Sequence, residues 1–103
     1  MIMKPKRPAF EAGETKTITF TDDGGNTLKV AKWLVKNFTT DSIEVSVGNE
    51  LTPSDNWKIP ANFYHEIPAG QVIEGYGYTA WEESITIKAT ASGEVEVVPV
   101  AWG

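Results

Sequence analysis

Two stretches near the end of the sequence alternate apolar and polar residues with the period of a half-buried β-strand. The apolar positions of this pattern are Ile85, Ile87, Ala89, Val95 and Val97. A three-residue loop, Ala91-Ser92-Gly93, with Gly93 at positive φ, would join the two stretches as a β-hairpin. In that register Thr90 faces Glu94, Lys88 faces Glu96 and Ile87 faces Val97. The sequence therefore predicts an all-β chain that ends in a hairpin over residues 84–100.

Five further strands are predicted from the same alternation and from the turn residues between them. They cover residues 15–21, 27–38, 42–48, 57–60 and 63–67. The strand over residues 42–48 alternates most clearly and is expected to be central, and a phase switch near Val30 predicts a β-bulge. Residues 71–81 are expected to form an irregular loop. About seven short strands without helical periodicity predict a small antiparallel β-sandwich.

The 103 residues suffice for one domain, which we assign to residues 14–103. Residues 1–13 combine two prolines with three of the nine basic residues of the chain, Lys4, Lys6 and Arg7. Few apolar residues are available there to anchor the segment, so an extended N-terminal arm is expected. Such an arm either frays or lies on a neighbouring subunit.

Composition excludes several classes of function. The net charge is −5, and the excess of acidic residues is larger outside the arm, which argues against a nucleic-acid-binding face. Cysteine is absent, so disulfides and thiolate chemistry are excluded. No stretch has the length of a membrane span, and the N-terminal sequence lacks the apolar run of a secretory signal. A protein made in the cytoplasm is the simplest expectation.

The residue types needed for catalysis or metal binding are sparse. His65 is the single histidine and lies in a predicted strand, so it is expected at the surface or boundary of a sheet rather than in a catalytic triad or a zinc site. Asp22 and Asp23 fit a turn better than a calcium loop. Asn37 begins a glycosylation sequon, yet its expected role is a turn into the next strand. We therefore expect no enzyme, no metal and no cofactor.

Aromatic residues in or beside predicted loops are the candidate contact residues. They are Trp57, Tyr64, Tyr76, Tyr78 and Trp81. Rings at the rim of a sandwich stack on sugar faces or anchor a protein partner. The alternative is that they are core residues, as expected for Trp33, because tryptophan is often buried between two sheets.

The rhythm of the strands resembles that of small β-sandwich proteins of tailed phages and prophages, which serve as decoration, neck or tail components. The resemblance covers approximately residues 35–100. The segments that carry it are Leu34-Val35-Lys36-Asn37, Ile43-Glu44-Val45-Ser46-Val47, Trp57-Lys58-Ile59-Pro60, Ile85-Thr86-Ile87-Lys88-Ala89 and Gly93-Glu94-Val95-Glu96-Val97. It implies a structural protein of a virion or phage-like particle, without catalytic residues and made in the host cytoplasm.

Two functions from different classes follow as hypotheses. The first is a structural or assembly protein that packs beside copies of itself or other virion subunits, with Lys4, Lys6 and Arg7 on an arm that reaches a neighbour. The second is a carbohydrate-binding module that uses the loop aromatics Trp57, Tyr76, Tyr78 and Trp81.

Overall fold

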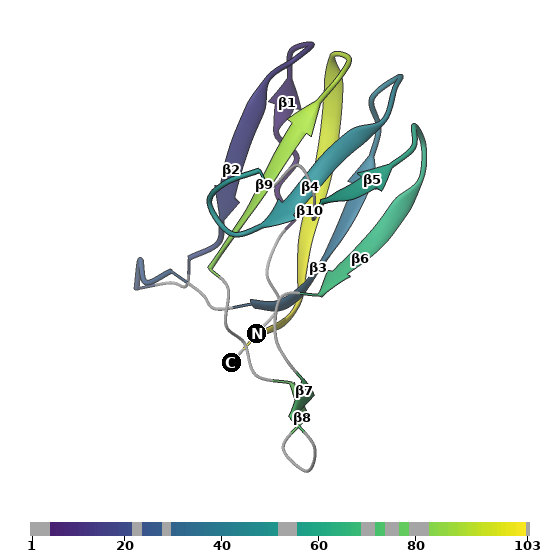
Figure 1. Ribbon diagram of the computed structural model, residues 1–103. Helices are drawn as coiled ribbons and strands as arrows, with labels where there is room; N and C mark the ends of the chain where they lie inside the picture. Colours follow the sequence, from purple (N-terminus) through teal and green to yellow (C-terminus); the bar gives the residue numbers. More distant parts are fainter. Residues whose placement is uncertain are drawn as a thin grey trace.

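The computed structural model describes residues 5–21, 24–27, 30–51, 56–68, 72–73, 77–78 and 83–102. These residues form a β-sandwich of two antiparallel four-stranded sheets and contain no helix (Figure 1). The predicted all-β sandwich is thereby confirmed.

The first sheet has the strand order β1-β10-β3-β6, and the second has the order β2-β9-β4-β5. The strands of the first sheet are β1 (Ala9–Phe10), β10 (Gly93–Trp102), β3 (Val30–Asn37) and β6 (Tyr64–Pro68). Those of the second are β2 (Thr15–Thr19), β9 (Ser84–Ala89), β4 (Ile43–Val47) and β5 (Trp57–Ile59). The predicted central strand, β4, indeed lies between two others. Away from both sheets, β7 (Val72–Ile73) pairs with β8 (Gly77–Tyr78) in the segment predicted to be an irregular loop (Figure 1).

The core lies between the sheets and is built from the residues that the alternation assigned to the inward phase. Trp33 is fully buried, as expected from its position in the sequence. The other fully buried large side chains are Phe20, Val30, Val35, Ile43, Val45, Ile59, Ile67, Ile85, Ile87, Val95 and Val97. The register of β3 against β10 shifts between Val30 and Lys32, which confirms the bulge predicted there.

The predicted hairpin over residues 84–100 is wrong. Both strands exist, but β9 pairs with β2 and β4, whereas β10 pairs with β1 and β3 in the opposite sheet. The two strands face each other across the core, so Lys88 lies opposite Glu44 rather than Glu96. An inward-facing alternation is common to hairpin partners and to strands of facing sheets, and for this reason the pattern alone did not separate the two arrangements.

Gly93 begins β10 at the point where the chain crosses between the sheets. Its φ is +147°, and a Cβ atom there would lie 2.9 Å from Cα of Thr39. A close backbone approach therefore requires glycine at this position, in addition to the positive φ expected for it.

The N-terminal segment is extended, as expected, but it is incorporated in its own sandwich. Ala9 and Phe10 pair with β10, and the N–H and C=O of Lys6 bond to Val97 at 3.0 and 2.8 Å. Phe10 is 3% exposed and belongs to the core. Within residues 5–13, Ala9–Phe10 form the edge strand β1 and Lys6 makes a separate bridge to Val97, because Phe10 supplies an apolar anchor that the sequence interpretation underestimated.

A buried polar network fixes the corner after β3. The Asn37 side chain donates from Nδ2 to the carbonyls of Asp41 and Ile59 at 2.8 and 3.0 Å. Its Oδ1 accepts from the N–H and the hydroxyl of Thr39 at 2.9 and 2.7 Å. Asn37 thus ties the turn before β4 to the end of β5, which confirms its predicted role in a turn.

Candidate functional site

The sandwich has two sides at which the edge strands of the two sheets face one another. The side between β1 and β2 is closed. Phe10 is buried there, and the Lys6 ammonium crosses between the sheets, donating to the carbonyl of Thr19 and lying 5.1 Å from the centre of the Phe20 ring. Lys16 lies 5.5 Å from the Phe10 ring. Side chains therefore seal this side of the core.

The opposite side, between β5 and β6, is open. His65 lies opposite Val35, and Trp57 lies opposite Val45. Residues directly opposite in an antiparallel pair share a face, and Val35 and Val45 are fully buried, so Trp57 and His65 are in the inward phase. Trp57 is nevertheless 37% exposed, and His65 is also exposed. Inward-phase side chains that keep this much exposure indicate that the described elements cover this side only in part.

Aromatic rings gather on this open side. The rings of Trp57 and His65 are 4.8 Å apart between centroids, tilted by 59°, and bridge the two sheets. Phe63, which precedes β6, is 63% exposed, and Tyr64 is 69% exposed. Phe38, the remaining exposed large hydrophobic residue of the described chain, is next to Asn37 and lies 4.8 Å from the Arg7 guanidinium.

A hollow of about 510 Å³ runs along β6. Its lining residues are Lys32, Trp57, Tyr64, His65, Glu66 and Pro68. Tyr64, Glu66 and Pro68 lie on one face of β6 and His65 on the other, while Lys32 comes from β3 and Trp57 from β5. The hollow therefore follows the free edge of β6. Its volume lies in the range of sites that hold ligands or partner side chains. Lys32 and Glu66 form an ion pair of 3.7 Å at its margin and provide both a donor and an acceptor.

The backbone of β6 has hydrogen-bonding groups that point away from β3. The Asn37 N–H donates to the carbonyl of Phe63 at 2.9 Å, which fixes the phase of the ladder. Because backbone groups alternate in an antiparallel pair, those of His65 and Ile67 face β3, and those of Tyr64 and Glu66 face the free edge. Pro68 has no N–H and ends this free edge.

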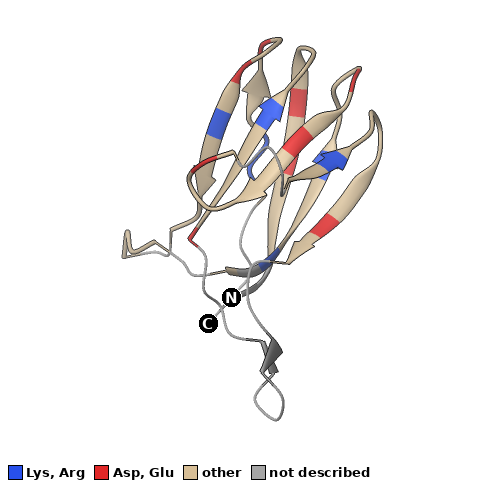
Figure 2. Cartoon of the chain, viewed as in Figure 1, with Lys and Arg blue, Asp and Glu red and all other residues tan. Residues whose placement is uncertain are grey.

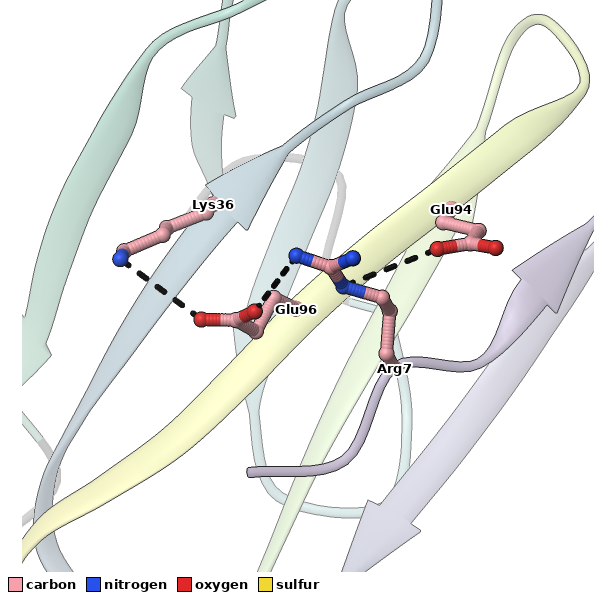
Figure 3. A network of polar contacts seen from close by, with 4 residues as sticks. All are labelled: Arg7, Lys36, Glu94 and Glu96. Carbon is pink, nitrogen blue, oxygen red and sulfur yellow. Dashed lines mark hydrogen bonds and ion pairs between the residues drawn. The ribbon is translucent and has the colours of Figure 1, made fainter. Parts of the chain in front are cut away.

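Charge on the outer face of the first sheet is paired across the strands. Arg7 contacts Glu94 at 3.6 Å and Glu96 at 2.9 Å, and Lys36 contacts Glu96 at 3.6 Å (Figure 3). Basic and acidic residues are interspersed over the described strands of both sheets (Figure 2). The open side is therefore distinguished by its exposed rings rather than by an excess of one charge.

The structure brings some of the predicted aromatic residues together and leaves others apart. Trp57 and Tyr64 line the same hollow. Tyr78 belongs to β8, and Tyr76 and Trp81 lie outside the described residues. The sequence reading missed Phe63 and His65 as members of this surface, although the alternation of Phe63, His65 and Ile67 was available as a signal.

Two of the predicted arm residues, Lys6 and Arg7, lie on the closed side. Lys6 and Arg7 line a second hollow, of about 450 Å³, together with Lys16 and residues of β2. Arg7 is engaged with Glu94 and Glu96, and Lys6 with Thr19. Lys4 lies outside the described residues. Within this chain, Lys6 and Arg7 hold the N-terminal segment against its own sheets.

The described residues offer little for metal binding or modification. No group of three His, Asp or Glu side chains in the described ranges could hold a metal ion. Asn37 is 1% exposed and both atoms of its amide are hydrogen-bonded, so the folded sequon does not present an acceptor for glycosylation. In the part of the chain that the structure describes, no helix has the length and apolar character needed to cross a membrane.

No protein-family model matches the chain, and neither the curated proteins nor the solved structures contain a match.

Proposed function

We propose that the protein is a non-enzymatic structural or assembly subunit that packs beside copies of itself through the open side between β5 and β6. A phage or phage-like particle is the setting that the resemblance of the sequence implies. The observation that carries the proposal is the exposure of Trp57, Phe63 and His65 in the inward phase of the two edge strands.

Exposed rings on a rigid scaffold favour association for a simple reason. Burying apolar surface stabilises a contact by approximately 25 cal/mol per Å², and aromatic side chains lose little conformational entropy on binding. The strands that carry the rings are already ordered by pairing with β4 and β3. Symmetric particles repeat one contact many times, so a weak contact between two copies is sufficient.

The test is the solution mass of the full chain, measured by light scattering from micromolar to millimolar concentration, beside that of Trp57→Ala. We expect reversible self-association that the substitution weakens. Lys58→Ala is the matched control, since Lys58 lies on the same strand but opposite Glu44 on the outer face. A chain that stays monomeric over the whole range would contradict the proposal.

The second candidate is a carbohydrate-binding module. It is favoured by the composition of the same hollow, where the Trp57 and Tyr64 rings adjoin the Lys32–Glu66 pair, because sugars offer apolar faces together with hydroxyl groups. A glycan screen with the intact protein and with Trp57→Ala tests this function. Retention of a glycan that the variant loses would support it, and no retention on any glycan would exclude it.

A further inference from the structure

The free edge of β6 suggests how two copies would meet. Strand β6 lies at the edge of the first sheet (Figure 1). By the phase of the ladder, Tyr64 and Glu66 each direct a backbone N–H and a backbone C=O to the side away from β3. A strand edge with unpaired groups is a template for another strand. We propose that β6 pairs antiparallel with β6 of a second copy across a two-fold axis at His65, joining the two first sheets into one. This inference rests on the proposed self-association and specifies its geometry.

The backbone selects this register. With His65 opposite His65 of the second copy, Tyr64 faces Glu66 of that copy, and each free-edge N–H meets a free-edge carbonyl. Shifting the axis to Glu66 would place Glu66 opposite its own equivalent and Pro68 opposite Tyr64. That register juxtaposes like charges and loses a donor, because Pro68 has no N–H.

The side chains agree with the same register. On the inward face, Phe63 falls opposite Ile67 of the second copy, so the ring that is now 63% exposed gains an apolar neighbour. The Trp57–His65 ring pair of each copy lies beside the axis. On the outer face, the Tyr64 hydroxyl falls opposite the Glu66 carboxylate, which accepts hydrogen bonds.

The other edge strands are poorer templates. The Lys6 ammonium donates a hydrogen bond to the Thr19 carbonyl on the edge of β2, so this carbonyl is not free to pair with another strand. Strand β1 has two residues, and β5 has three. Strands β2 and β6 have five residues each, but of the two only β6 carries an exposed aromatic side chain, so the pairing is assigned to it.

Glu66→Pro tests the pairing directly. The substitution deletes the N–H that points to the free edge and leaves the ladder to β3, which uses His65 and Ile67. Proline is tolerated on edge strands. Sedimentation equilibrium should show association weakened at least about tenfold, since one hydrogen bond is lost on each side of the axis. Glu66→Gln keeps the N–H and should remain within about threefold of the natural chain.

Two further variants distinguish the loss of strand pairing from a general loss of folding. Phe63→Glu alters an exposed side chain and should also weaken association, because a carboxylate would face Ile67 of the second copy. Thr17→Pro removes a free-edge N–H from β2 on the closed side and should leave association unchanged. Association of Glu66→Pro equal to that of the natural chain would overturn strand pairing while leaving the proposed function standing, whereas a monomeric natural chain would overturn both.

Discussion

The closed and the open side of the sandwich are built from the same kind of sequence and differ in what covers them. On the closed side, Phe10 reaches the core and Lys6 spans from the first sheet to the second. On the open side, Trp57 and His65 point inward by their register but remain partly exposed. Strand alternation therefore determines which way a side chain points, and a neighbouring element determines whether it is buried.

This difference separates residues that stabilise the fold from residues available for binding. Burial that is complete within one chain contributes to the free energy of unfolding. An inward-phase ring left uncovered contributes less to folding and can gain by association. Substitutions on the two sides should therefore act on different measurements.

Phe10→Ala should have the largest effect on stability. Removing a buried phenylalanine costs about 3–5 kcal/mol, through lost apolar burial and the cavity that remains. The free energy of unfolding, measured by urea denaturation, should fall by that amount. A loss below about 1 kcal/mol would mean that the N-terminal strand does not close this side of the core.

Asn37→Ala should have the second largest effect on stability, because Asn37 ties the turn before β4 to the end of β5 on the open side. The substitution leaves the carbonyl of Ile59 and the N–H of Thr39 without this partner, whereas the carbonyl of Asp41 keeps the Thr39 hydroxyl at 2.7 Å. Each unsatisfied buried group costs about 1–3 kcal/mol, so a total near 3 kcal/mol is expected from urea denaturation. Thr40→Ala, an exposed neighbour, is the control and should be nearly neutral.

Trp57→Ala should affect self-association more than stability, whereas Phe10→Ala should affect stability. We expect it to reduce the free energy of unfolding by about 2 kcal/mol, less than Phe10→Ala, because 37% of Trp57 is already exposed in the folded chain. Its effect on self-association should be the larger one. A stability loss as great as that of Phe10→Ala would show that the open side is part of the core and would weaken the distinction between the sides.

Arg7→Met should have the smallest effect on stability of these substitutions. The Arg7 side chain is 52% exposed, and its partner Glu96, which is 14% exposed, keeps Lys36 as a second cation, so the loss should stay within the range of about 0.2–1 kcal/mol for exposed ion pairs, which salt screens. Thermal unfolding should shift slightly at low salt and not measurably at high salt. A loss that persists in high salt would indicate that the packing of Arg7 on Phe38, rather than its ion pairs, holds the N-terminal segment.

The sequence sufficed to predict where most strands lie and which residues face inward. It did not reveal strand pairing, because the alternation of β9 and β10 suits a hairpin and a crossing between sheets equally well. It also missed β1, since one apolar residue, Phe10, anchors a segment otherwise rich in proline and positive charge. The candidate site was predicted in part: Trp57 and Tyr64 were identified, but their proximity to His65 depends on a contact between different sheets.

Amide hydrogen exchange of the full chain, measured by NMR at low and at high protein concentration, compares the two sides in one experiment. The account predicts that the Tyr64 and Glu66 amides on the open side become protected as concentration rises, while the Thr17 amide on the closed side continues to exchange rapidly. Protection that appears at Thr17, or at neither side, would contradict the claim that β6 is the edge through which copies of this protein associate.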